Sequence, residues 1–77
     1  MQPNIIEIFN NRIYTPAFIA DMKMIPYRNN GFCSETTIKK LIENKELIGD
    51  SKGIKGNILA QFLESNFPDV RISRIHE

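Results

Sequence analysis

The chain has 77 residues and a mass of 8.9 kDa, a length that predicts one domain over residues 1–77. Hydrophobic residues make up 42% of the sequence and charged residues 25%, which excludes an intrinsically disordered composition. Ten basic and nine acidic residues give a net charge of +1, so no strongly charged tail points to a partner.

The single cysteine and the single histidine limit the chemistry that the chain can carry. Cys33 alone cannot form an intrachain disulfide, and with His76 it cannot complete a zinc site. No Gly-rich phosphate loop or carboxylate dyad is present, so we expect no enzyme, cofactor or small-molecule substrate. A small domain without disulfides favours a cytoplasmic compartment. We expect no signal peptide and no membrane-spanning segment, which needs roughly 20 apolar residues.

An N-terminal β arm is predicted over residues 4–14. Ile5–Phe9 is rich in β-branched and aromatic residues, and Arg12–Tyr14 can form a second short strand. Asn10 and Asn11 tolerate positive φ, so they can close a tight hairpin between the two strands. One irregular arm is the alternative interpretation.

The first helix is predicted from Pro16 to Met24. Thr15 can cap its free N–H groups, and a proline loses nothing at the first helical position. Pro26 is expected to end it, because the proline ring disfavours the α conformation at the preceding residue. Three apolar side chains share its inward face: Phe18, Ile19 and Met22.

The connection over residues 24–33 reads as a loop that contains a proline and Asn29-Asn30-Gly31. We expect Tyr27 and Phe32 to fold back onto the core rather than form a base-stacking platform. Cys33 is interpreted as a small buried residue, and His76 as an exposed one.

The second helix is predicted from Glu35 to Lys45, with Ser34 as its cap. Glu35 suits the positive end of the helix dipole and can pair with Lys39 one turn later. Three side chains are expected to face inward: Ile38, Leu41 and Ile42.

A β turn and a third helix are predicted to follow. Leu47–Ile48 and Ile54–Lys55 can form two strands around the turn Gly49–Gly53. Asn57 is the expected helix cap, and Asn66 and Pro68 are expected to end the helix. Four apolar residues form its inward face: Ile58, Leu59, Phe62 and Leu63.

A C-terminal strand and tail are predicted over residues 68–77. Val70–Ser73 alternates like a half-buried strand that can pair with the N-terminal residues, and Arg74–Glu77 is expected to fray. The predicted fold class is therefore α+β, mainly α, with three helices and short β elements.

Three stretches carry a resemblance to a known family. They are Tyr14-Thr15-Pro16-x-x-Ile19-Ala20, Ser34-x-x-Thr37-Ile38-x-x-Leu41-Ile42-x-x-x-x-Leu47 and Gly53-Ile54-Lys55-Gly56-x-Ile58-Leu59-x-x-Phe62-Leu63. In this order and spacing, over about Tyr14 to Glu64, the chain resembles the excisionase and MerR-type winged helix-turn-helix family. We place the core of such a domain at about residues 12–67. The connection over residues 24–33 is longer than the turn between the family's two helices.

The resemblance implies binding to double-stranded DNA. Members act as excision factors, recombination-directionality factors or small transcriptional regulators, often in phages and mobile elements. It implies a recognition helix at about residues 35–45 in the major groove and a wing at about residues 47–56 on the adjacent backbone or minor groove. The positions that it assigns to DNA are Ser34, Glu35, Thr36, Thr37, Lys39, Lys40, Lys52 and Lys55. Arg28 is added beside the resemblance as a further basic residue that can contact phosphate.

Each of these positions has a conditional role. Backbone N–H groups near Ser34 can hold a phosphate. Side chains that can reach base edges are Thr36, Thr37 and Lys40. Side chains that can contact phosphates are Arg28, Lys39, Lys52 and Lys55.

The distribution of charge along the chain agrees with DNA binding, although other functions stay open. Residues 22–56 hold seven basic and four acidic residues, a net charge of +3, and the rest hold three and five, a net charge of −2. The same lysines also suit an ordinary solvated helix face and surface turn. A non-enzymatic adaptor or inhibitor that binds another protein is the main alternative, and RNA or single-strand binding is the third. A DNA-binding domain this small is also expected to need a second copy or a recombinase or regulator partner.

Overall fold

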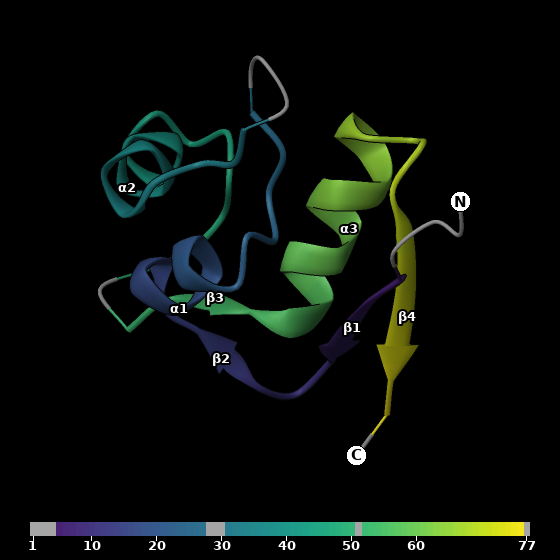
Figure 1. Cartoon of the computed structure of the whole chain (residues 1–77). Coiled ribbons are helices and arrows are strands. Elements are labelled where there is room, and N and C mark those ends of the chain that lie inside the picture. The colour runs from purple at the N-terminus through teal and green to yellow at the C-terminus, as the bar shows by residue number, and fades with distance from the viewer. Residues whose placement is uncertain (1–4, 28–30, 51, 77) are drawn as a thin grey trace.

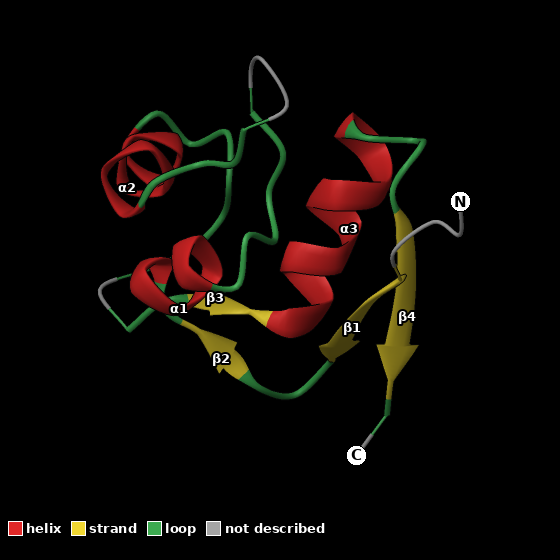
Figure 2. Ribbon diagram, viewed as in Figure 1, coloured by secondary structure: helices red, strands yellow, loops and turns green. Residues whose placement is uncertain are grey.

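A computed structural model describes residues 5–27, 31–50 and 52–76. In chain order the elements are β1 (Ile5–Phe9), β2 (Ile13–Tyr14), α1 (Pro16–Asp21), α2 (Glu35–Glu43), β3 (Ile54–Lys55), α3 (Gly56–Asn66) and β4 (Arg71–Ile75). Figure 2 shows β1 and β4 side by side at one end of the molecule and the α1–α2 pair at the other. The prediction of a mixed α/β fold with three helices is therefore confirmed.

The first and last strands form a parallel sheet. β1 pairs with β4 in a register that runs from Ile5 opposite Arg71 to Phe9 opposite Ile75, and α3 packs on both strands. Ile8 is fully buried and belongs to the same core cluster as Leu59 and Leu63 of α3. The predicted pairing of the C-terminal strand with the N-terminal residues is confirmed. Fraying from Arg74 onward is wrong, because Arg74 belongs to β4 and its guanidinium pairs with Glu64 on α3.

The predicted hairpin at Asn10-Asn11 is wrong, although the chain does turn there. β2 pairs with β3 rather than with β1, in an antiparallel register that sets Tyr14 opposite Ile54. The backbone of Asn10 is already engaged elsewhere, because its N–H donates to the Ile75 carbonyl at 3.0 Å and its carbonyl accepts from the Asn57 N–H at 3.2 Å. The turn therefore carries the chain from one sheet to the other.

Helix α1 begins as predicted and ends three residues early. Thr15 Oγ1 accepts a hydrogen bond from the Phe18 N–H at 3.2 Å, and Pro16 is the first helical residue. Lys23 has a φ of 53°, and this left-handed residue closes the helix before Pro26 can. A helix this short buries only Ile19 completely. Phe18 and Met22, which were expected to face inward, are 46% and 58% exposed.

The connection between α1 and α2 doubles back on itself. The Tyr27 N–H donates to the Gly31 carbonyl at 2.9 Å, and the Cys33 N–H donates to the Ile25 carbonyl at 2.8 Å. Ile25 and Cys33 are buried and anchor its two arms, whereas Tyr27 and Phe32 lie beyond these anchors and are 52% and 47% exposed. The expectation that both rings pack on the core is wrong. Residues 28–30, which include Arg28, lie outside the described residues.

Helix α2 begins at the predicted residue and ends at Glu43 rather than at Lys45. Ser34 Oγ accepts from the Thr37 N–H at 3.3 Å, which confirms the cap. Lys45 has a φ of 64° and lies outside the helix. Ile38 is fully buried, and Leu41 and Ile42 are partly buried against the core, as expected for the inward face.

The segment after α2 contains a turn but no strand at Leu47–Ile48. The Leu47 N–H donates to the Leu41 carbonyl at 3.1 Å, so Leu47 folds back onto the helix and its side chain is buried. Asp50 and Gly53 exchange two backbone hydrogen bonds of 3.0 and 3.1 Å, which confirms a tight turn. The returning strand β3 pairs with β2, so the predicted two-stranded hairpin within residues 47–56 is wrong.

Helix α3 joins the two sheets and carries much of the core. Its first turn needs no side-chain cap, because the Gly56 N–H donates to the Arg12 carbonyl at 2.8 Å and the Asn57 N–H to the Asn10 carbonyl. Asn57 is thus not the cap, whereas the predicted end at Asn66 is confirmed. Figure 1 shows α3 between the α1–α2 pair and strands β1 and β4. Residues with no exposed surface come from β1, the three helices and β3: Ile8, Ile19, Ile38, Ile54, Leu59 and Leu63.

Candidate nucleic-acid interface

The outward surface of α2, called here the α2 face, consists of the exposed residues Glu35, Thr36, Lys39, Lys40 and Glu43. The helix forms there because Ser34 caps it and Ile38 anchors it on the core. The Thr37 hydroxyl lies 3.1 Å from the Ser34 hydroxyl, and the residue is only half exposed. Thr37 thus supports the cap, whereas Thr36 and Lys40 project outward.

Charges on the α2 face are balanced. Lys39 Nζ lies 3.0 Å from Glu35 Oε2, and both side chains are about half exposed or more, at 62% and 48%. This confirms the predicted pair and neutralises one lysine. Lys40 has no ion-pair partner among the described residues. The α2 face therefore presents two lysines and two glutamates, of which Lys40 is the basic group most available to a ligand.

The turn after α2 is fixed against β2 by its glycine. Gly53 has a φ of 132°, and a Cβ there would lie 2.5 Å from the Tyr14 carbonyl oxygen. Asp50 Oδ1 accepts from the Lys52 N–H at 2.8 Å and rigidifies the loop. Lys52 follows in this turn and Lys55 in β3, and both are exposed.

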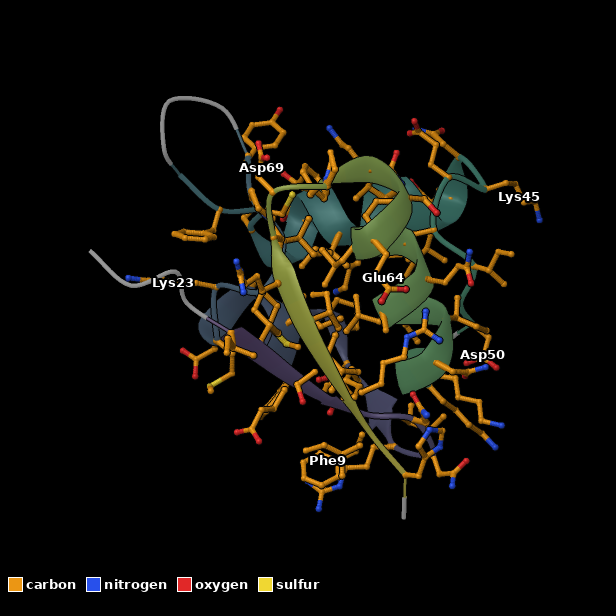
Figure 3. The ribbon with its side chains drawn as sticks, turned by 90° about the vertical axis from the view of Figure 1, so that its right-hand side faces the viewer. Phe9, Lys23, Lys45, Asp50, Glu64 and Asp69 are labelled. Atoms are coloured by element: carbon orange, nitrogen blue, oxygen red, sulfur yellow. The ribbon has the colours of Figure 1, made fainter. Side chains whose placement is uncertain are left out.

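The α2 face and this turn belong to one continuous surface. A shallow recess of about 430 Å³ lies between them, and it is lined by Pro16, Lys39, Ile42, Glu43 and Asp50. Figure 3 shows Lys45 and Asp50 on one side of α3 and Lys23 and Asp69 on the other. Of the nine residues singled out from the sequence, Lys39 lines this recess, and the others on α2 or its cap are Ser34, Glu35, Thr36, Thr37 and Lys40. Lys52 lies in the turn and Lys55 in β3, and Arg28 lies outside the described residues.

A second surface was missed by sequence reasoning. An open apolar groove of about 950 Å³, called here the edge groove, runs between β1, α1 and the end of the 24–33 connection. Its most exposed apolar side chains are Ile5, Phe18, Met22 and Phe32. The available signal was the number of apolar residues around α1, which exceeds what so short a helix can bury.

Cys33 and His76 match their predicted roles as buried and exposed residues. Burial raises the pKa of the Cys33 thiol, whose sulfur lies 3.8 Å from the Pro26 carbonyl oxygen. His76 Nδ1 lies 3.0 Å from Asn10 Nδ2. Within the described ranges, no three His, Cys, Asp or Glu side chains gather in a way that could hold a metal ion.

Comparison with known proteins found no relative of this chain. Neither family models, curated proteins nor solved structures gave a match. None of the helices among the described residues has the length and apolar character needed to cross a membrane.

Proposed function

We propose that this chain is a small non-enzymatic protein that binds double-stranded DNA through the α2 face and the turn after it. The observation that carries the proposal is their shared surface, since Lys39 and Asp50 line one recess while Thr36 and Lys40 project beside it. A helix presented together with a basic turn is the arrangement by which winged helix-turn-helix proteins place one element in the major groove and another on the backbone.

The contacts divide by chemistry. Thr36 and Lys40 are the side chains that would reach base edges, where lysine suits guanine O6 and N7 and a threonine methyl suits thymine. Lys39, Lys52 and Lys55 would contact phosphates and fix the orientation. Pairing of Lys39 with Glu35 reduces the repulsion between that carboxylate and the DNA backbone.

Phosphate contacts in this arrangement are few. The α2 face has no net charge, and the turn adds Lys52 and Lys55 against Asp50. Each neutralised phosphate contributes about −0.9 to the slope of log affinity against log salt. A single copy would therefore bind modestly, and we propose that tandem copies or a recombinase or regulator protein complete the complex, as in an excision factor or small transcriptional regulator.

The test is a salt titration of the full chain on a random duplex, followed by fluorescence anisotropy. We expect measurable affinity at low salt that falls as salt rises, because lysine–phosphate contacts release counterions. Binding that is absent at every salt concentration would contradict the proposal.

A charge-reversal pair locates the surface. Lys40→Glu with Lys55→Glu should abolish binding and leave thermal stability nearly unchanged, because both side chains are exposed. The matched control is Lys23→Glu with Arg71→Glu, two exposed residues away from the α2 face whose replacement changes the net charge equally. Equal losses in both pairs would mean that overall charge, rather than this surface, holds the DNA.

A second function, a protein adaptor or inhibitor in the cytoplasm, is favoured by a different observation. The edge groove exposes several large apolar side chains together, and such patches commonly mark protein-binding sites. It lies apart from the α2 face, so one molecule can use both surfaces.

A further inference from the structure

Strand β1 has one paired edge and one open edge. It pairs with β4 alone, in a sheet of two strands, so within the described part of the chain its other edge has no strand partner. An open edge presents unpaired N–H and C=O groups and is a template for an additional strand.

Hydrogen bonds at the end of β1 show which backbone groups face outward. The Asn10 N–H donates to Ile75 on β4, whereas the Phe9 N–H donates to the Tyr14 hydroxyl at 2.9 Å and the Phe9 carbonyl accepts from the Arg12 N–H. Backbone groups of a strand alternate in direction, so those of Ile5 and Glu7 point the same way as those of Phe9. The chain itself satisfies the Phe9 end, whereas the outward groups of Ile5 and Glu7 have no hydrogen-bond partner among the residues that the structure describes.

The open edge faces the edge groove. Tyr14, which binds the Phe9 N–H, is one of the residues that line the groove, and its ring lies 5.7 Å from that of Phe18 on α1. Across from β1 the wall is formed by Phe18, Met22 and Phe32. A strand added to β1 would therefore have apolar side chains beside it in addition to backbone partners along one edge.

Glu7 is the one charged residue of β1, while the rest of the groove lining adds Arg12, Lys23 and Asp69. Glu7 is exposed at the centre of β1 and has no ion-pair partner among the described residues. Opposite charges on neighbouring strands stabilise a pair, and like charges destabilise it. We propose that the edge groove binds an extended peptide segment of a partner protein, about five residues long, with a Lys or Arg beside Glu7 and apolar residues on either side.

A single extended segment fits better than a second copy of this chain. Both walls of the groove belong to one molecule, so only one strand can lie between them, whereas a second copy would bring β4 along with its own β1. Antiparallel self-pairing centred on Glu7 would also set two carboxylates side by side. This inference concerns a surface separate from the α2 face and does not depend on DNA binding.

The probe is a set of fluorescent peptides of seven residues, in which valine and threonine alternate on either side of one central position. The central position is lysine in the first peptide and glutamate in the second. The third peptide has the central lysine, and its backbone nitrogens on the side that would face β1 are methylated. Anisotropy is measured with the full chain. We expect the lysine peptide to bind about tenfold more tightly than the glutamate peptide and the N-methylated peptide not to bind.

Two substitutions and one control test whether the peptide binds in the edge groove. Glu7→Lys should reverse the preference, so that the glutamate peptide binds more tightly. Met22→Asp should abolish binding, whereas Ile48→Asp, at a residue that is 68% exposed and outside the groove, should leave it unchanged. All three positions are exposed, and circular dichroism checks that each variant keeps the helical signal of the unaltered chain.

Three results would overturn the proposal. The first is that no peptide binds more tightly than a Kd of about 1 mM. The second is binding that survives Met22→Asp or N-methylation. The third is a dimer in sedimentation equilibrium that dissociates on Met22→Asp, which would make a second copy the occupant. DNA affinity is expected to be the same for Met22→Asp and the unaltered chain, so failure here leaves the proposed DNA surface to its own test.

Discussion

The two small sheets of this molecule join different parts of the fold. The β2–β3 sheet has two residue pairs and ties the start of α1 to the turn beside α2, so it shapes the polar surface assigned to DNA. The β1–β4 sheet has five pairs, joins the first and last strands of the chain, and packs against α3. It leaves one edge open beside apolar side chains. The open strand edge therefore belongs to β1, whereas Tyr14 of β2 contributes to both regions, because it pairs with β3 and also lines the edge groove.

Short polar links join the two sheets. The Phe9 N–H in β1 donates to the hydroxyl of Tyr14 in β2, and carbonyls of Asn10 and Arg12 accept from the first turn of α3. Since α3 also packs on both sheets, we expect the molecule to unfold as one cooperative unit. Substitutions within each sheet and at the links between them test whether the sheets are coupled in this way.

The largest effect is expected for Gly56→Ala, at the point where α3 meets both sheets. A Cβ on Gly56 would lie 1.9 Å from the carbonyl oxygen and 2.8 Å from the carbonyl carbon of Phe9, and these backbone atoms cannot rotate away as a side chain could. We expect the free energy of unfolding in urea to fall by more than about 3 kcal/mol. Asn57→Ala, one residue later and exposed, is the control and should stay within about 0.5 kcal/mol. A loss below about 1 kcal/mol for Gly56→Ala would contradict the close contact.

A matched pair of core substitutions compares the sheets directly. Ile8 in β1 and Ile54 in β3 are both fully buried, so Ile8→Ala and Ile54→Ala should each cost about 3 kcal/mol in urea unfolding. If the sheets are coupled, both variants should also lower hydrogen-exchange protection throughout α3. Loss of protection that stays within β1 and β4 in the Ile8 variant would show that this sheet unfolds separately.

A smaller effect is expected for Tyr14→Phe, which removes one link between the sheets. The ring of Tyr14 is 6% exposed and would remain packed, while the Phe9 N–H would lose its acceptor at 2.9 Å. We expect a loss of about 1 kcal/mol in thermal or urea unfolding. Ser65→Ala, at an exposed position on α3, is the control. An unchanged stability for Tyr14→Phe would mean that water replaces the hydroxyl without cost.

The smallest effect concerns Cys33, which lies outside both sheets. Burial raises the pKa of this thiol from its ordinary value of 9.0, so the folded chain holds it protonated where the unfolded chain begins to ionise. The resulting stabilisation is complete below the ordinary pKa and is lost as pH rises through the folded value. We expect iodoacetamide to alkylate Cys33 more slowly at pH 8 in buffer than in urea. Mass spectrometry measures the fraction of alkylated chain over time. Equal rates would show that the thiol is not protected.

Local signals in the sequence predicted the helices well and their ends less well. Thr15 and Ser34 were identified as caps because a cap depends on a few neighbouring residues. The ends of α1 and α2 were misplaced because Lys23 and Lys45 adopt positive φ, and lysine carries no sequence signal for that conformation.

The pairing of β2 with β3 and the grouping of the candidate site could not be obtained in the same way. The Glu35–Lys39 pair followed from helical spacing, whereas the closeness of Lys39 and Asp50 depends on how the turn packs against α2. The alternation in Val70–Ser73 indicated a strand that pairs with the N-terminal residues, but nothing near Asn10 indicated that β2 would leave β1 and pair with β3. For the same reason the exposure of Met22 was missed, since burial depends on contacts far away in sequence.

The parallel pairing of β1 with β4 has a consequence for synthesis on the ribosome. Ile5 and its partner Arg71 are separated by most of the chain, and at about 5–20 residues per second the wait between them lasts several seconds. During this time the nascent chain exposes an apolar strand with both edges unpaired. The β1 segment is therefore prone to aggregation until the residues of β4 have been synthesised.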